Sequence, residues 1–563
     1  MTPMIRPVFL AAATALFAFT SAPGMLRATS LAGSYLAAGQ ANFDSDYEAA
    51  ALYYARALTV DPGNLALMQN LVLAYLAEGR VDKSIAVAVE MDKLGTDSQL
   101  AQLLLLTRDI KMGDFTAVNA KFKAGAEFSP LLDGLVQSWS LLGAGKMTAA
   151  TARFDKMAKN DTMKVFSDYH RALALAVVGD FGAAEKVLAG ANGRPVRIGR
   201  ASLVAHIEIL SQLERNDEAL AMANAALGNS NDPEITAMRD RLKAGKTLKF
   251  DVVTSPTDGI SAAFYTLASV LSGQDNQRFG LIYGRIAEYL NPTSVSAILL
   301  VADLLNGEKQ YDLAVKNFDK VPGDSPFFYS AEIGRAKSLT DANKIDDGLN
   351  VLRKLSKTQP NVPAVFTTLG DALRRQSKFA EASKAYEAAI KLLPDPGANQ
   401  WFIYYARGIT YEREGLWDKS VADFRFALKL SPDQPMVLNY LGYGMVEKGI
   451  NLDEAQKMIE TAVAKRPNDG YITDSLGWVL YRVKKYKQSV PHMERAVELQ
   501  PVDPIINDHL GDVYWMVGRK LEAEFQWRRA LSFKPEEKEA KRIQQKLDIG
   551  LDAVLKKEAA ASK

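Results

Sequence analysis

The chain has 563 residues, of which 48% are hydrophobic and 24% are charged, and it contains no cysteine. Its 68 basic and 66 acidic residues almost cancel, and no basic tract stands out that would favour nucleic acid or an anionic membrane surface. The lack of cysteine excludes disulfides, thiolate chemistry and a lipid-modified N-terminal cysteine. We therefore predict no nucleic-acid partner and no lipid anchor.

The first 30 residues differ from the rest of the chain. Arg6 is followed by an uncharged run that ends at Arg27, and its most apolar part covers residues 8–19. This part is much shorter than the about 20 apolar residues that a membrane-spanning helix needs, but it is typical of a secretory signal. Residues 1–30 are therefore predicted to be a signal peptide for export, with an uncleaved N-terminal anchor as the alternative.

Residues 31–246 show helical periodicity with weak repetition. The segment EAAALYYARAL, which begins at Glu48 and precedes Pro62, predicts a strong amphipathic helix. Between residues 65 and 228, turn signals recur about every 30 to 36 residues, in the segments AEGRVD, KMGDF, GAGKM, VVGDF and LERND. We interpret residues 31–246 as degenerate helix-turn-helix repeats, with unrelated helical hairpins as the alternative.

A stretch without helical period follows. The segment TLKFDVVTSPTDG, residues 247–259, is rich in β-branched residues and contains Pro256 and Gly259. We predict that residues 247–256 form an extended crossover linker between two superhelical segments. The alternative is a long loop within one continuous coil.

Regularly spaced prolines mark residues 257–535. They are Pro292, Pro326, Pro360, Pro394, Pro432, Pro467, Pro501 and Pro535, at intervals of 34, 34, 34, 38, 35, 34 and 34 residues. About 24 residues before each of the last five lies a glycine, namely Gly370, Gly408, Gly442, Gly477 and Gly511. A constant period near 34 predicts a helix-turn-helix solenoid. Glycine allows two paired helices to approach closely, and proline ends the second helix.

The last repeat carries a recognisable set of residues. It reads Leu510-Gly511, Tyr514, Ala523, Trp527, Ala530 and Pro535, and the repeats around Gly370 and Gly477 follow the same order. This order resembles the tetratricopeptide motif. The resemblance implies an all-α fold, a TPR α-solenoid, in which we expect about 14 helix-turn-helix pairs in one or two superhelical segments. The C-terminal tetratricopeptide array is predicted to cover residues 257–535.

The C-terminal residues 536–563 are predicted to be a capping helix and tail. Ile543, Leu547, Leu551 and Val554 fall on one stripe of this helix. The stripe is expected to cover the exposed seam of the last repeat, because terminal repeats of a solenoid need a cap to stay soluble.

No catalytic or metal-binding set is found in the sequence. The four histidines, His170, His206, His492 and His509, show no metal-ligand spacing, and there is no Gly-rich phosphate loop. We therefore predict that the chain is not an enzyme and uses no cofactor or metal.

The first helices of the last four repeats contain the candidate binding residues. In a tetratricopeptide array these helices line the concave surface. Positions that helix packing leaves free carry aromatic residues mixed with Asn, Asp and His, which indicates a protein-binding wall. The predicted protein-binding residues are Phe402, Tyr405, Asn439, Tyr440, Tyr443, Tyr471, Asp474, Trp478, Tyr481, Asp508, His509, Asp512 and Trp515. The alternative is that several of them pack between adjacent first helices.

Two segments indicate a more specific group. Residues 451–490, continued by residues 506–535, resemble exported tetratricopeptide proteins of Gram-negative bacteria, and GSYLAAGQANFDSDYEAAALYYARAL near the N-terminus resembles the alphaproteobacterial branch. One relative in this group is a lipoprotein adaptor of a periplasmic carboxyl-terminal processing protease, to which it presents peptidoglycan hydrolases. The present chain departs from that relative because it lacks the lipobox cysteine.

The resemblance implies a non-catalytic scaffold or adaptor in the periplasm. Its expected partners are other proteins, including a periplasmic processing protease and peptidoglycan hydrolases. Membrane contact is expected only indirectly or through an uncleaved signal segment, and the open ends of a solenoid leave room for self-association. The alternative is a component of an exopolysaccharide, secretion or outer-membrane assembly complex.

Overall fold

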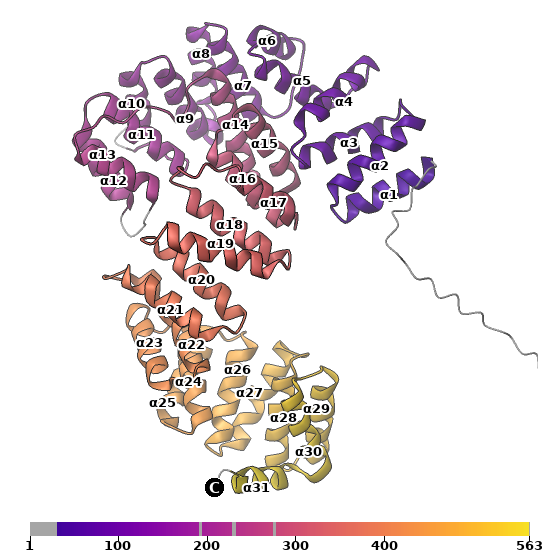
Figure 1. Cartoon of the computed structure of the whole chain (residues 1–563), viewed down its shortest axis with the longest axis vertical. Helices are drawn as coiled ribbons and strands as arrows, with labels where there is room; N and C mark the ends of the chain where they lie inside the picture. Colours follow the sequence, from indigo (N-terminus) through magenta and orange to yellow (C-terminus); the bar gives the residue numbers. More distant parts are fainter. Residues whose placement is uncertain (1–30, 191–193, 228–231, 274–276, 562–563) are drawn as a thin grey trace, which may run out of the picture. The chain divides into compact units, whose positions relative to one another are not determined.

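The computed structural model describes residues 31–190, 194–227, 232–273 and 277–561 (Figure 1). Every regular element within these ranges is helical, which confirms the predicted all-α solenoid. The signal peptide predicted at residues 1–30 lies outside the described residues. None of the helices in the described ranges is both long and apolar enough to span a bilayer.

The chain divides into two compact units, Met1–Phe327 and Phe328–Lys563. The helices of the first unit are α1 (Leu31–Phe43), α2 (Tyr47–Val60), α3 (Leu65–Ala77), α4 (Val81–Lys93), α5 (Gln99–Lys111), α6 (Phe115–Lys123), α7 (Pro130–Gly143), α8 (Met147–Met157), α9 (Asp161–Val177), α10 (Phe181–Ala189), α11 (Arg200–Gln212), α12 (Asn216–Leu227), α13 (Pro233–Lys243), α14 (Pro256–Ser272), α15 (Gln277–Leu290), α16 (Val295–Gly307) and α17 (Tyr311–Phe318).

The second unit continues the same pattern. Its helices are α18 (Phe328–Asp341), α19 (Ile345–Thr358), α20 (Pro363–Arg375), α21 (Phe379–Lys391), the 3-10 helix η2 (Ala398–Gln400), α22 (Trp401–Arg413), α23 (Trp417–Leu430), α24 (Pro435–Lys448), α25 (Leu452–Lys465), α26 (Gly470–Arg482), α27 (Tyr486–Leu499), α28 (Pro504–Met516), α29 (Lys520–Ser532), α30 (Glu537–Ile549) and α31 (Leu551–Ala561). Counted over the described ranges, fourteen helix pairs precede α30, with α13 as a single helix between two pairs.

The turns within pairs form where the sequence predicted them. Gly79, Gly113 and Gly145 follow α3, α5 and α7 with φ of +80°, +75° and +73°, a left-handed conformation that glycine adopts without strain. Side-chain caps begin several helices: Asn64 accepts a hydrogen bond from the Leu67 backbone N–H of α3, and Asp503 caps α28 through the Ile506 N–H. Local sequence therefore sets where most helices begin and end.

The motif glycines mark close approaches between paired helices. A Cβ added to Gly511 of α28 would lie 2.4 Å from Nε1 of Trp527 on α29, and one on Gly370 of α20 would lie 2.7 Å from the ring of Tyr386 on α21. Both aromatic side chains are fully buried. The large residue of the second helix thus fills the space that the glycine leaves free.

Helices α14 and α15, near the end of the first unit, pack against earlier helices of the same unit. Helix α14 contacts α7 and α9, and α15 contacts α3, α4 and α5 (Figure 1). The approach is close, since a Cβ on Gly259 of α14 would lie 2.3 Å from the indole of Trp139 on α7. The core of this unit therefore joins repeats that are more than 100 residues apart in the chain.

The linker predicted at residues 247–256 has no regular secondary structure up to the start of α14 at Pro256. Leu248, Phe250 and Val253 of this stretch are buried, and the ring of Phe250 meets that of Phe181 edge-on at 6.0 Å. The sequence assigned α14–α17 to a segment distinct from the N-terminal repeats, whereas these helices belong to the first compact unit. Repeat periodicity predicts which helices are neighbours along the chain, but it does not predict contacts between distant repeats.

Candidate protein-binding groove

The predicted binding residues all lie on the first helices α22, α24, α26 and α28 of the second unit. Their exposure differs. Tyr471 and Phe402 are exposed by 56% and 43%, while Tyr405, Asn439, Tyr440, Tyr443 and Trp515 are half-buried. The remaining residues, Asp474, Trp478, Tyr481, Asp508, His509 and Asp512, are buried. For these six, packing between neighbouring helices accounts for most of the side-chain surface.

Two adjoining pockets lie along these helices, and together we call them the groove. Among the predicted residues, the first pocket is lined by Asn439, Tyr440, Tyr443, Tyr471 and Asp474. The second is lined by Tyr443, Trp478, Tyr481, Asp508 and His509. The pockets share Tyr443, Glu447 and Ile505, so that they form one continuous depression across α24, α26 and α28.

Some residues lie differently from the prediction. Phe402, Tyr405, Asp512 and Trp515 are not among the side chains that line the two pockets. Conversely, the first pocket has lining residues that were not predicted, among them Glu412, Arg413, Trp417, Glu447, Lys448, Asp503, Ile505 and Ile506. Of these, Trp417 lies at the start of the second helix α23, and it was missed because the prediction considered first helices only.

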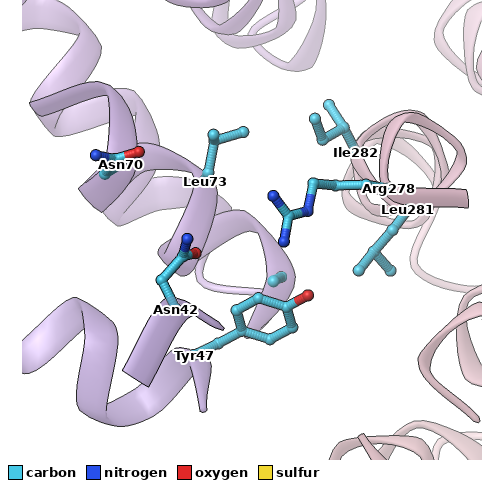
Figure 2. Close-up of a pocket in the computed structure, with 8 residues that line it drawn as sticks. Asn42, Tyr47, Asn70, Leu73, Arg278, Leu281 and Ile282 are labelled. Carbon is cyan, nitrogen blue, oxygen red and sulfur yellow. The ribbon is translucent and has the colours of Figure 1, made fainter. Parts of the chain in front are cut away.

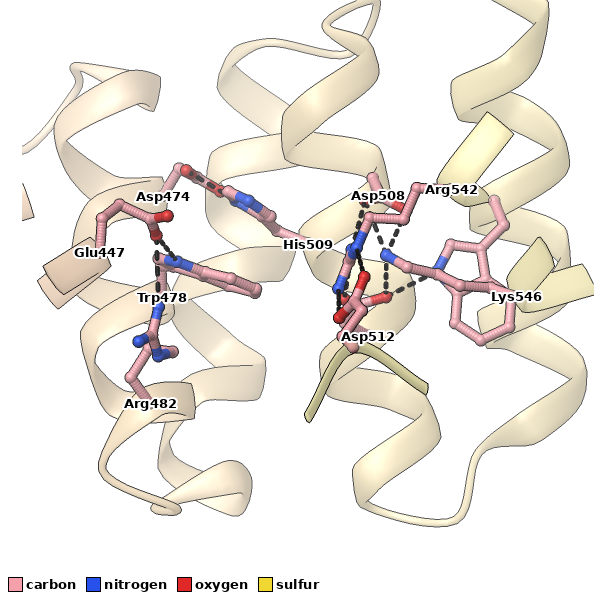
Figure 3. Close-up of polar contacts among 11 residues, drawn as sticks. Glu447, Asp474, Trp478, Arg482, Asp508, His509, Asp512, Arg542 and Lys546 are labelled. Atoms are coloured by element: carbon pink, nitrogen blue, oxygen red, sulfur yellow. Dashed lines mark hydrogen bonds and ion pairs between the residues drawn. The ribbon is translucent and has the colours of Figure 1, made fainter. Parts of the chain in front are cut away.

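Trp478 connects three consecutive first helices (Figure 3). Its indole Nε1–H donates a hydrogen bond to Glu447 of α24 at 2.7 Å. Its ring is stacked on His509 of α28, with 3.9 Å between centroids, and on Tyr481 of its own helix at 4.7 Å. The side chain therefore stabilises the floor of the groove and offers little free surface to a partner.

His509 and Asp474 form a buried pair at the same place. Nδ1 of the imidazole lies 3.1 Å from both carboxylate oxygens of Asp474. Burial opposes the charged imidazole, but Asp474, and to a smaller extent Asp508 and Asp512, outweigh this effect and raise the pKa of His509. The protonated ring then balances a carboxylate that would otherwise be unpaired beneath the groove.

Lys546 of α30 is buried and pairs with two predicted binding residues. Its ammonium lies 2.8 Å from Asp508 and 2.6 Å from Asp512, while Trp527 Nε1 donates to Asp512 at 3.0 Å (Figure 3). Asp508 and Asp512 thus hold the C-terminal helices in place. The sequence has one feature that indicates this contact: the charged Lys546 lies on the apolar stripe of the helix that includes Ile543 and Leu547.

The groove leaves a few polar groups without partners. Oδ1 of Asn439 is buried, and no hydrogen-bond donor among the described residues reaches it. Tyr443, one turn further along α24, lines both pockets, and burial raises the pKa of its hydroxyl, so that the proton stays on oxygen. Asn439 and Tyr443 both line the first pocket and place an amide and a hydroxyl between its aromatic walls.

No group of three or more His, Asp or Glu side chains within the described ranges is arranged to hold a metal ion. The polar residues of the groove are instead paired with one another, as the bonds of Glu447, Asp474 and Asp508 illustrate.

Comparisons with known proteins agree with this architecture. Residues 43–94, 333–396 and 367–435 match the family described as Tetratricopeptide repeat. A TPR repeat-containing protein of Pseudomonas aeruginosa is 27% identical over 165 residues, which is 29% of this chain and 27% of that protein. Human tetratricopeptide repeat protein 13 is 26% identical over 31% of this chain and 20% of its own length. The chain thus matches only about a quarter of the length of these relatives.

Solved structures give looser matches. The Cut9 complex with Hcn1 superimposes with a TM-score of 0.39 at 15% identity, over 92% of this chain and 96% of that chain. Yeast Tom70 superimposes with a TM-score of 0.29 over 94% of this chain and 99% of that chain. These superpositions are too loose to add to the functional argument. Arrays of this family generally serve as non-catalytic scaffolds for protein–protein interaction. Matches to the Tetratricopeptide repeat family thus lie in both units, and the chain contains repeats of this type.

Proposed function

We propose that the chain is a non-catalytic scaffold of the bacterial periplasm, whose second unit holds segments of cell-envelope proteins in the groove. The observation that carries this proposal is the continuity of the two pockets through Tyr443 and Glu447. A bound segment would contact the aromatic walls and form hydrogen bonds with polar side chains that line the pockets, such as Asn439 and Tyr443. Export is supported by the uncharged run between Arg6 and Arg27.

A more specific role is part of the same proposal. The scaffold would present cell-wall hydrolases to a carboxyl-terminal processing protease. Its support is the resemblance of residues 451–490 and of the N-terminal repeat to exported tetratricopeptide proteins. Attachment to a membrane would then depend on a partner or on a retained N-terminal segment.

The test is site-specific photocrosslinking in cells. A photoreactive phenylalanine replaces Tyr471 in the groove or, as a matched control, Phe525, which is exposed by 64% on the second helix α29. Crosslinks formed only at position 471 identify the groove partner by mass spectrometry. A processing protease together with wall hydrolases supports the adaptor role. Recovery of polysaccharide export or outer-membrane assembly components instead would replace it by the alternative named above.

The identified partner is then purified and titrated against the full chain. Tyr443→Ala combined with Tyr471→Ala is expected to weaken binding by at least about tenfold, since truncation of an aromatic hot-spot residue costs about 2 kcal/mol or more. Phe525→Ala should leave the affinity unchanged. Equal affinities for all variants, with unchanged melting temperatures, would rule out the groove as the binding site.

A further inference from the structure

Apart from the groove, a pocket lies in the first unit, where α15 meets the first two repeats (Figure 2). It is lined by Asn42, Tyr47, Asn70, Leu73, Ala77, Arg278, Leu281 and Ile282. Its volume of about 40 Å³ exceeds what a single water molecule needs and suits a group of a few heavy atoms. We call it the α15 pocket.

The walls of the α15 pocket are fixed by bonds between distant repeats. Arg285 of α15 donates to the Ala77 carbonyl of α3 at 2.8 Å, and the Tyr289 hydroxyl donates to Asp82 of α4 at 2.6 Å. Lys111 of α5 donates to the Tyr289 carbonyl at 2.7 Å. These bonds hold the second half of α15 against the first repeats, and Leu281 and Ile282 in its first half form the wall opposite Leu73. The pocket exists only because α15 returns to the first repeats.

The polar side chains of the pocket are two amides, a hydroxyl and a guanidinium, of which the amides and the guanidinium have unused donors among the described residues. In the described part of the chain, the side chains of Asn42, Asn70 and Arg278 make no hydrogen bond and no ion pair. Figure 2 shows the guanidinium of Arg278 reaching from α15 toward Asn42 and Tyr47. Arg278 is the one charged side chain among the lining residues.

One carboxylate lies near the pocket. Glu308 accepts a weak hydrogen bond of 3.4 Å from the Tyr47 hydroxyl, and both Glu308 and Arg278 act on the pKa of Tyr47, which burial raises. Glu308 forms no ion pair with Arg278 within the described residues, where its contact is with Tyr47. Among these residues the guanidinium thus has its donors free for a ligand, and the charge of Glu308 disfavours ligands with more than one negative charge.

We propose that the α15 pocket binds a single carboxylate group of a partner protein, with Arg278 as the main contact. A guanidinium matches a carboxylate with two parallel N–H bonds, and the amides of Asn42 and Asn70 can supply further donors. The carboxylate is either that of an Asp or Glu side chain or that of a chain terminus. This site is separate from the groove of the second unit, so the inference does not depend on the proposed function.

The test titrates two small probes into the full chain and measures saturation-transfer NMR. Acetyl-aspartate amide carries only a side-chain carboxylate, and acetyl-alanine carries only a terminal one. Acetyl-asparagine amide is the neutral reference. We expect binding of one or both carboxylate probes and none of the neutral probe. The probe that binds identifies the source of the carboxylate.

Variants connect the signal to the pocket. Arg278→Gln should reduce the saturation transfer about tenfold or more, because it removes a charge-assisted bond, and Arg278→Lys should retain part of it. Arg56→Gln, an exposed arginine on the outer face of α2, is the matched control and should behave as the parent. Absence of carboxylate binding, an equal signal from the neutral probe, or an unchanged signal in Arg278→Gln would overturn the proposal. Equal melting temperatures exclude unfolding as the cause.

Discussion

The ammonium of Lys546 lies 2.6 Å from a carboxylate oxygen of Asp512, and neither side chain has more than 1% of its surface exposed. The two residues belong to α30 and α28, which are separated in sequence by the second helix α29. A buried ion pair of this kind adds little net stability, but its disruption is costly because it leaves an unpaired charge in the interior. The pair therefore fixes where the C-terminal helices dock.

We predict that Lys546→Met destabilises the C-terminal helices by up to about 3–5 kcal/mol, since it removes the nearest counter-charge of Asp508 and Asp512 and leaves them only the longer ion pairs with Arg542. Hydrogen exchange of the full chain, read by mass spectrometry, should show faster exchange in α30 and α31. Lys541→Met is the control, because this lysine of α30 is 72% exposed and its pair with Glu537 contributes little.

A triple variant tests the cause of this effect. Adding Asp508→Asn and Asp512→Asn to Lys546→Met removes the unpaired charges and keeps an acceptor for Trp527 Nε1. Much of the lost protection should return. If the triple variant exchanges as fast as the single one, buried charge is not the reason for the destabilisation.

The second prediction concerns pH. The pKa of His509 is raised above 6.5 in the folded chain, since Asp474, Asp508 and Asp512 outweigh the effect of burial. A histidine with a raised pKa stabilises the fold fully below its unfolded pKa and loses this contribution as pH rises through the folded value. Stability of α26 and α28 should therefore fall as pH rises above about 6.5.

His509→Gln should remove this pH dependence and keep a donor for Asp474. The measurement is hydrogen exchange of α26 and α28 between about pH 6 and 9, corrected for intrinsic rates. His492→Gln is the control, because burial lowers the pKa of His492, so that its effect on stability appears only below about pH 6.5 and not in the range where His509 acts. If the parent and His509→Gln lose protection equally as pH rises, His509 is not the cause of the pH dependence.

The sequence predicted the helix pairs correctly because their signals are local. Gly79 and Gly113 adopt left-handed turns at the segments AEGRVD and KMGDF, and Pro504 opens α28 one residue after its cap. Each of these signals acts within a few residues of the structure it specifies. The same is true of Gly511, whose partner Trp527 lies on the next helix.

The return of α15 to α3–α5 could not be predicted in this way. Arg285 bonds to Ala77 across 208 residues, and a repeat pattern contains no information about such a distance. The contact depends on how the small rotation between successive pairs accumulates along the solenoid. The α15 pocket was missed for the same reason.

The groove was predicted in part. Its position on α22–α28 follows from the repeat phase, whereas the exposure of each residue depends on the neighbouring repeat. Trp478 lies at a position that its own helix pair leaves free, but His509 of the next repeat covers its ring. Asp508 and Asp512 were expected to face a partner and instead face Lys546. A single repeat does not reveal such contacts.

The third prediction uses the motif glycines. Gly511→Ala would place a Cβ 2.4 Å from the buried indole of Trp527, which cannot move away without disturbing α29. We expect a loss of about 1–3 kcal/mol, as for overpacked cores. Gly39→Ala in α1 is the control, because nothing lies within 4 Å of its added Cβ. Alanine there should be neutral or stabilising by up to about 1 kcal/mol. Urea denaturation measures the free energy of unfolding of both variants. Equal changes in Gly511→Ala and Gly39→Ala would contradict the close approach of α28 and α29.

The last prediction separates packing from binding among the groove aromatics. Trp478→Ala should cost about 3–5 kcal/mol, since the indole is buried, stacked on His509 and bonded to Glu447. Tyr471→Ala should cost less than about 0.5 kcal/mol, because this side chain is 56% exposed at the rim of the groove. Thermal and urea unfolding of the two variants measure the difference. A large loss for Tyr471→Ala would mean that it packs against more of the fold than its exposure implies. A negligible loss for Trp478→Ala would mean that its stacking is not needed to join α24, α26 and α28, and that its indole is available to a partner.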